Sequence, residues 1–176
     1  IRQLSMLGKP LIVAGCMAKA EPDVVGKINP QASLLGPNSI DHIIDVANNA
    51  IRGIRMTILE DSRVEKPELP HVRLNPVIEI VEISTGCLLS CSFCQTKLAR
   101  GNLRSYRPEM IRRQIEAAVN DGCREIWLTS QDNSAYGLDI GTDLAELLSS
   151  ICKNINGDYL IRVGMMNPLR LKKGLL

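Results

Sequence analysis

In the first fifty positions, short continuous runs of apolar residues are followed by segments in which apolar residues recur at the spacing of a helix. The runs at 10–15 and 32–35 each end at a glycine and predict short buried strands. Helices are predicted from about residue 21 and from residue 38 or 39 to about 52. The second helix is expected to bury one apolar face, formed by Ile40, Ile43, Ile44, Ala47 and Ile51. The order strand, helix, strand, helix predicts an α/β domain.

From residue 77 the pattern becomes strand, loop, helix, repeated. Strands are predicted at 77–83, 125–129 and 159–163, with helices at 108–121 and 142–151. Pro108 opens the first helix, Gly122 ends it, and Thr142 is expected to cap the second. This is the winding of a parallel sheet or (β/α) barrel, in which chemistry gathers on loops at the carboxyl ends of strands. With only about three such units, the chain cannot close a barrel by itself.

The regular pattern breaks down between residues 53 and 76. Charged residues and prolines follow one another closely there, which is typical of a linker. We therefore predict an amino-terminal domain at 1–60, a linker at 61–76 and a second domain at 77–176.

Composition changes this picture only slightly. The 176 residues are 45% hydrophobic and 23% charged, as in ordinary globular proteins, and no apolar run is long enough to span a bilayer. The net charge of +2 does not by itself require a nucleic-acid partner. Five arginines nevertheless fall close together, which fits either phosphate contacts or a solvated helix face: Arg100, Arg104, Arg107, Arg112 and Arg113.

Six cysteines without a signal peptide favour a reducing compartment, and we expect a cytoplasmic protein. The chain begins with Ile1 rather than methionine, and both of its ends look cut from a longer protein.

The most informative cysteines are Cys87, Cys91 and Cys94, spaced C-x3-C-x2-C directly after a predicted strand. Iron–sulfur clusters normally have four cysteine ligands, so three indicate a 4Fe–4S cluster with one iron left open. That arrangement favours a cluster that binds S-adenosylmethionine. Zinc needs four ligands, but there is no second C-x2-C pair, and His42 and His71 are isolated surface or core histidines. A disulfide remains a further alternative.

Several longer motifs extend the signal beyond the cysteines. They lie at 86–94, 99–101, 105–109, 125–132, 136–137 and 161–168. With these motifs the chain closely resembles the radical S-adenosylmethionine methylthiotransferases, and in particular the archaeal and eukaryotic branch that acts on threonylcarbamoyladenosine in tRNA. The resemblance implies a partial radical SAM (β/α) barrel, preceded by the end of a flavodoxin-like α/β amino-terminal domain.

The resemblance also implies roles for individual residues. Cys87, Cys91 and Cys94 would ligate the 4Fe–4S cluster whose open iron binds S-adenosylmethionine. Phe93 would then lie along the adenine of the cofactor. Two further residues, Gln131 and Asp132, would line the cofactor or substrate pocket.

Cys16 matches one of three cysteines that hold a second 4Fe–4S cluster in the amino-terminal domain of the family. The other two are expected upstream of Ile1 and are absent here. Neither Cys123 nor Cys152 has ligand spacing to Cys16, and both are expected to be buried, inert thiols.

The implied reaction is methylthiolation of C2 of the modified adenosine next to the anticodon. Its partners would be tRNA, S-adenosylmethionine and an electron donor. Sister enzymes act on isopentenyladenosine or on a ribosomal protein, so these substrates stay open as alternatives. A non-catalytic iron–sulfur or zinc module is a third reading. The fragment lacks the rest of the barrel and the RNA-binding domain of the family, which brings its activity in isolation into question.

Overall fold

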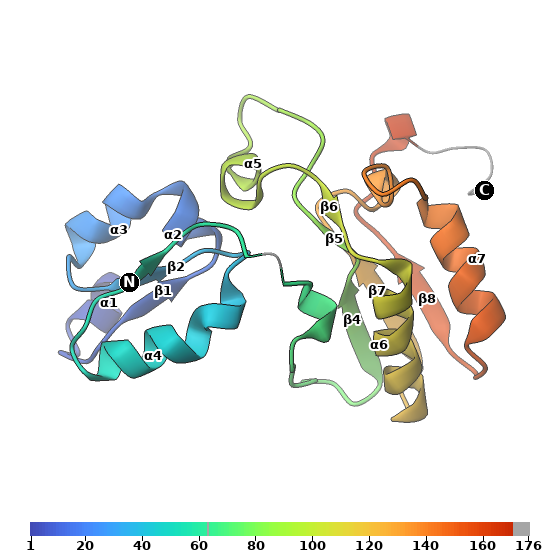
Figure 1. Cartoon of the computed structure of the whole chain (residues 1–176), viewed down its shortest axis with the longest axis horizontal. Helices are drawn as coiled ribbons and strands as arrows, with labels where there is room; N and C mark the ends of the chain where they lie inside the picture. Colours follow the sequence, from blue (N-terminus) through green and yellow to red (C-terminus); the bar gives the residue numbers. More distant parts are fainter. Residues whose placement is uncertain (63, 171–176) are drawn as a thin grey trace. The chain divides into compact units, whose positions relative to one another are not determined.

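A computed structural model describes residues 1–62 and 64–170 of the chain (Figure 1). The chain divides into two compact units. The first unit takes residues up to Val64 together with Ser90–Gly101, and the second takes Glu65–Leu89 together with the chain from Asn102 onward. Both units contain parallel sheets and helices, which confirms the α/β class.

The first unit contains a small parallel sheet in the order β1-β2-β3. Its strands are β1 (Ile12–Ala14), β2 (Ser33–Leu35) and β3 (Thr57–Ile58). The central strand β2 is buried at every position, as predicted. The edge strand β1 is only partly buried, because it has a neighbour on one side alone. The sequence pattern gave no sign of β3.

The first unit also contains short helices (Figure 1). They are α1 (Arg2–Ser5), α2 (Cys16–Ala20), α3 (Pro22–Ile28), α4 (Ile43–Ile51) and α5 (Gln95–Arg100), with a 3-10 turn η1 at Ile40–His42. The last of these helices, α5, packs against α2. The small core joins Ala18 and Val25 of the helices to Ala32 and Leu34 beside and within β2.

The predicted buried face of α4 is wrong at Ile44 and Ile51. Ile44 and Ile51 are 70% and 76% exposed, whereas Val46 and Ala50 are buried. Val46 and Ala50 lie four residues apart and therefore share a face of the helix. This face packs toward the sheet, so Ile44 and Ile51 point to solvent, whereas Ile43 and Ala47 are partly buried.

The second unit contains a larger parallel sheet and a short antiparallel pair. The parallel sheet has the order β4-β7-β8, formed by β4 (Ile78–Glu82), β7 (Glu125–Thr129) and β8 (Leu160–Val163). The antiparallel pair joins β5 (Ser84–Thr85) to β6 (Arg104–Ser105). All three strands of the parallel sheet agree with the predicted strands to within a residue or two.

Two long helices cover one face of the parallel sheet (Figure 1). They are α6 (Pro108–Asn120) and α7 (Leu144–Asn154); three 3-10 turns complete the unit, namely η2 (Lys66–Glu68), η3 (Asn133–Ala135) and η4 (Pro168–Arg170). Pro108 opens α6 as predicted. The cap of α7 is Asp143 rather than Thr142, because the Asp143 carboxylate accepts a hydrogen bond from the Glu146 N–H at 3.0 Å.

The register of the strands decides which side chains meet the helices. Val81, Leu128 and Val163 lie across from one another on neighbouring strands and belong to the core beneath α6 and α7. The opposite face carries Trp127, whose ring lies 4.5 Å from the Arg162 guanidinium carbon. Among the residues that the structure describes, every helix is too short or too polar to cross a membrane.

Candidate functional site

The cysteine loop begins where β5 ends. Gly86 has a φ of 75°, in the left-handed region that favours glycine, and so turns the chain into Cys87. Cys87 and Cys94 are partly buried and Cys91 is exposed; none of the three forms a disulfide. The Leu89 N–H donates to the Cys87 sulfur at 3.4 Å. Cys87 belongs to the second unit, and Cys91 and Cys94 to the first.

The backbone that follows Cys94 lowers the pKa of its thiol. Cys94 directly precedes α5, and the backbone N–H of Lys97 is the main cause that lowers the pKa of its thiol. Hydrogen bonds from Thr96 and the charge of Lys97 act in the same direction, while desolvation opposes them. The thiolate is the form that ligates metals, so this loop favours it.

The donor set fits an iron–sulfur cluster in its chemistry. It consists of three closely spaced thiols that are free of disulfides and not fully buried. Within residues 1–62 and 64–170, no three His, Cys, Asp or Glu side chains gather as they would around a metal ion. His42 lies next to Asp41, and His71 pairs with Glu79, so both histidines have the surface or core roles expected from the sequence.

The remaining cysteines differ from one another. Cys16 is exposed and is the first residue of α2. Cys123 is 1% exposed and packs in the core of the second unit, which confirms its predicted burial; burial raises its pKa. Cys152 is exposed, so its predicted burial is wrong. It follows Ile151 on α7, and consecutive helical residues point in different directions, so only Ile151 reaches the core.

Phe93 and Gln131 have surfaces that a ligand could use. The Phe93 side chain, between two motif cysteines, is 87% exposed. Gln131 directly follows the loop residue Ser130 after β7 and is partly buried. Its Oε1 atom is inaccessible to solvent and accepts no hydrogen bond within the described part of the chain.

Asp132 joins the loop after β7 to the loop after β8. One carboxylate oxygen accepts hydrogen bonds from the backbone N–H groups of Ser134 at 3.1 Å and Asn167 at 3.2 Å. The other oxygen lies 3.7 Å from Nε of Arg170. With 6% of its surface exposed, Asp132 shapes the loops at this sheet edge.

Asn133 makes the second link between these loops, and the sequence analysis did not single it out. Its side-chain amide donates to the carbonyl oxygens of Leu128 at 3.0 Å and Gly164 at 2.6 Å, and its own N–H donates to that of Met165 at 2.9 Å. Asn133 is fully buried. The loops after β7 and β8 therefore lie side by side at the carboxyl edge of the sheet, as expected for parallel strands.

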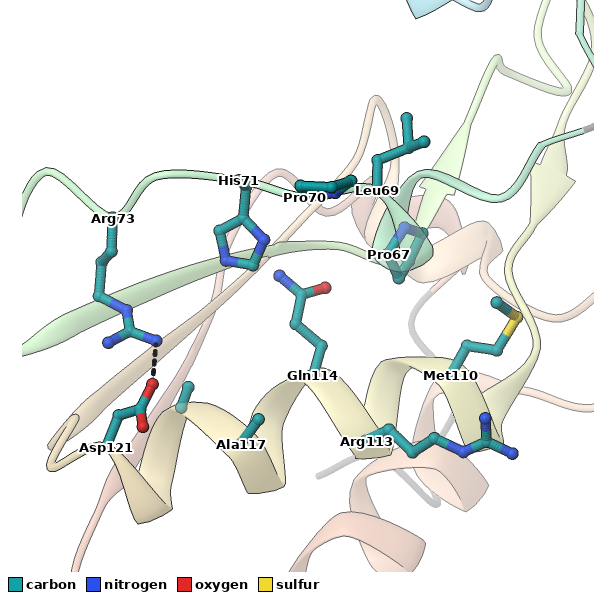
Figure 2. Close-up of a pocket in the computed structure, with 11 residues that line it drawn as sticks. Pro67, Leu69, Pro70, His71, Arg73, Met110, Arg113, Gln114, Ala117 and Asp121 are labelled. Atoms are coloured by element: carbon teal, nitrogen blue, oxygen red, sulfur yellow. Dashed lines mark ion pairs between the residues drawn. The ribbon is translucent and has the colours of Figure 1, made fainter. Parts of the chain in front are cut away.

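A cavity of about 690 Å³ lies elsewhere in the second unit, between η2 with its following segment and α6 (Figure 2). Beside it, the buried Glu79 carboxylate accepts hydrogen bonds from Arg73 Nε at 2.7 Å and Gln114 Nε2 at 2.6 Å, and lies 2.9 Å from His71 Nε2. Arg73 also pairs with Asp121 at 3.5 Å, as the dashed line in Figure 2 shows. Arg113 from the arginine cluster lines this cavity, whereas the predicted cluster and cofactor residues do not.

Arg107 and Arg112, from the arginine cluster, contact other residues of this unit. Arg107 pairs with Glu65 at 3.0 Å, and Arg112 donates to Ser150 at 3.5 Å. The Arg107–Glu65 ion pair is partly exposed, and ion pairs of this kind add little stability.

Several known proteins with closely matching names are similar to this chain over nearly its whole length. The protein from Pyrococcus abyssi named "Probable threonylcarbamoyladenosine tRNA methylthiotransferase" is 41% identical over 176 residues, which cover 98% of this chain and 41% of the relative. Proteins named "Threonylcarbamoyladenosine tRNA methylthiotransferase" from Drosophila melanogaster and Mus musculus are 39% and 37% identical; the matches cover 92% and 96% of this chain but only 30% of each relative.

The chain thus spans less than half the length of these relatives. The family description "Radical SAM superfamily" matches residues 81–172, slightly more than half of the chain. That match includes the cysteine motif, the loop with Asp132 and all of β7 and β8. The chain therefore belongs to the radical SAM superfamily.

Proposed function

We propose that the protein to which this chain contributes is a tRNA methylthiotransferase that modifies C2 of N6-threonylcarbamoyladenosine next to the anticodon. The observation that carries this is the C-x3-C-x2-C motif that follows β5, within a superfamily match and among relatives named for that reaction. Isopentenyladenosine tRNA and a ribosomal protein are the alternative substrates.

Membership of the radical SAM superfamily implies a 4Fe–4S cluster and S-adenosylmethionine. Cys87, Cys91 and Cys94 would hold the cluster, and their free thiols fit that role. Together the cluster and cofactor supply radical chemistry that can break a C–H bond too weakly acidic for a protein base. The chain contributes the thiolates, of which Cys94 is stabilised by the backbone N–H groups at the start of α5.

The neighbouring residues bind and orient. Phe93 offers an exposed ring on which the adenine of the cofactor can lie. Gln131 has a buried carbonyl oxygen without a hydrogen-bond donor among the described residues, so a ligand N–H or O–H can supply one. Asp132 holds the loops after β7 and β8 together and thereby shapes the pocket wall.

Cys16 would be one ligand of a second 4Fe–4S cluster. Its exposure and its position after a strand end support this assignment. The other ligands would come from outside this chain. An electron donor would be a further partner, beside tRNA and S-adenosylmethionine. We place the protein in the cytoplasm, where thiols stay reduced.

The proposed function also implies a division of the chain into domains. We infer that residues 77–176 form the first half of a radical SAM (β/α) barrel. Residues 1–60 would end a flavodoxin-like amino-terminal domain, with residues 61–76 as the linker. The parallel order β4-β7-β8, with helices on one face, supports the barrel.

The first test concerns the cluster. The chain is reconstituted anaerobically with iron and sulfide, reduced, and studied by electron paramagnetic resonance with and without S-adenosylmethionine. A 4Fe–4S signal that changes on adding the cofactor is expected. Cys91→Ala should abolish the signal, and the matched change Cys123→Ala should preserve it, since Cys123 is buried in the core. Uptake of zinc instead, or a signal indifferent to the cofactor, would favour a non-catalytic module.

The second test concerns the substrate. Reconstituted protein is incubated with S-adenosylmethionine, a reductant and tRNA that carries either threonylcarbamoyladenosine or isopentenyladenosine, and the nucleosides are analysed by mass spectrometry. Addition of a methylthio group to the threonylcarbamoyl nucleoside alone is expected. Addition to the isopentenyl nucleoside would move the protein to the sister branch.

A further inference from the structure

The carboxyl edge of the first unit's sheet carries three polar or reactive residues. Cys16 follows β1, Asn38 follows β2, and Asp61 follows β3. Because these strands are parallel, their carboxyl ends meet at one edge of the sheet. In open α/β sheets this is the edge where ligand-binding loops lie.

Helix α5 is held to this unit at both of its ends. At its first residue, the Gln95 side-chain amide donates to the Glu21 carboxylate. At its last residue, the carbonyl oxygen of Arg100 accepts a hydrogen bond from Asn38 Nδ2 at 3.3 Å. Lys19 of α2 pairs with Asp61, which lies close to Gly101 after α5.

Small side chains let α2 and α5 approach each other. The two helices are in contact, and each contributes a fully buried alanine, Ala18 from α2 and Ala99 from α5. Asn38 is also buried, at 5% exposure, so its bond to the end of α5 is shielded from water. We call Ala18, Glu21 and Asn38, with the Lys19–Asp61 pair, the α5 seat.

The seat is what gives α5 its structure. A helix of six residues is unstable by itself in water, because nucleation costs more than so few hydrogen bonds return. The last carbonyl groups of a helix also have no partner within it. Asn38 supplies one such partner, and Glu21 fixes the opposite end.

We propose that Glu21, Asn38 and Gln95 are positioning residues for the second half of the cysteine motif. Cys94 directly precedes α5, so the seat fixes the backbone from which the Cys94 thiol projects. Cys16 is the first residue of α2, the helix that α5 packs against. The role of the cysteines rests on the proposed function, whereas the seat itself does not.

Hydrogen–deuterium exchange of the reduced, metal-free chain tests the seat. Gln95→Glu places a second carboxylate beside Glu21, and amide exchange in residues 95–101 should become about two- to tenfold faster, as expected for the loss of one hydrogen bond. The double change Glu21→Gln with Gln95→Glu restores a donor and an acceptor and should return the exchange to that of the parent. Asn38→Ala should give a similar increase without any change of charge.

The matched control is Gln3→Glu, the same chemical change at an exposed position of α1. It should leave residues 95–101 unaffected. Unchanged exchange in Gln95→Glu, or an equal increase in the peptides of β4 and β7, would overturn the seat.

A spectroscopic measurement separates an effect on the position of the motif cysteines from an effect on the stability of α5 alone. After reconstitution, Gln95→Glu should retain its iron but show an altered paramagnetic response to S-adenosylmethionine, and the double change should restore it. Faster exchange with an unaltered spectrum would overturn the positioning role. If the parent chain binds no cluster at all, the proposed function and the positioning role both fail, while the exchange result still decides the seat.

Discussion

Gly137 gives the sharpest test of how the second unit is built. Its φ is 83°, and a β-carbon placed there would lie 2.5 Å from the carbonyl oxygen of Thr142. Gly141 has a similar φ of 75° but nothing within 4 Å of its added β-carbon. Both glycines lie in the same turn region before α7, so they differ mainly in the space around them.

The expected loss in the free energy of unfolding has two parts, the strain of a positive φ and the steric overlap of the added β-carbon. An alanine with positive φ costs about 1 kcal/mol at either position. At Gly137 the overlap with backbone atoms adds about 1–3 kcal/mol, because the Thr142 carbonyl must shift. Gly137→Ala should therefore lower the free energy of unfolding by about 2–4 kcal/mol, and Gly141→Ala by about 1 kcal/mol.

Urea unfolding followed by tryptophan fluorescence measures this difference. The chain has one tryptophan, Trp127 on β7, so the signal reports on the unit that contains both glycines. The midpoints should separate while the dependence on urea stays the same. Equal losses for Gly137→Ala and Gly141→Ala would show that the close approach to Thr142 has no energetic weight, and would refute the reasoning.

Three further outcomes are expected. Burial raises the pKa of the Tyr136 phenol, so the folded state favours its neutral form. The free energy of unfolding should therefore fall as the pH rises past about 10, where the phenol ionises in the unfolded chain. The variant Tyr136→Phe should show a smaller fall. Glu79→Ala should cost about 3 kcal/mol in urea unfolding, because the donors around the buried carboxylate lose their partner; the exposed control Glu116→Ala should change it by less than about 0.5 kcal/mol. Iodoacetamide should alkylate the exposed Cys152 at least about tenfold faster than the buried Cys123, and equal rates would contradict their different burial.

The sequence predicted the second unit well because its elements carry strong local signals. Helix α6 shows the reason: Pro108 opens it, and Met110, Ile111 and Ile115 recur at helical spacing and are buried. The helix therefore has one face that can meet the sheet. Strands β4, β7 and β8 were found for a similar reason, since β-branched residues are concentrated in them.

The first unit was harder to predict because non-local contacts decide its details. β3 has only two residues, too few to show any period. The spacing of isoleucines on α4 wrongly placed Ile44 and Ile51 in the buried face, which is instead centred on Val46 and Ala50. The attachments of α5 join residues separated by 74 and 62 positions in the sequence, and no local pattern reports such distances.

Buried polar residues in the second unit show why position matters more than burial in recognising a site. Glu79 is 1% exposed and accepts hydrogen bonds from Arg73 and Gln114, but it lies near the amino end of β4, away from the loops at the carboxyl edge. Asp132 and Asn133 are also buried, yet they lie after the carboxyl end of β7, next to Gln131 with its buried oxygen. Burying polar groups is costly unless they are paired, so a cluster of them at a loop edge needs a reason beyond packing. In a parallel sheet the carboxyl edge supplies that reason, because the loops there are free of the strand ladder and can be shaped around a ligand. The polar cluster around Asp132 follows the carboxyl end of β7, and that placement is what makes it a candidate for ligand binding.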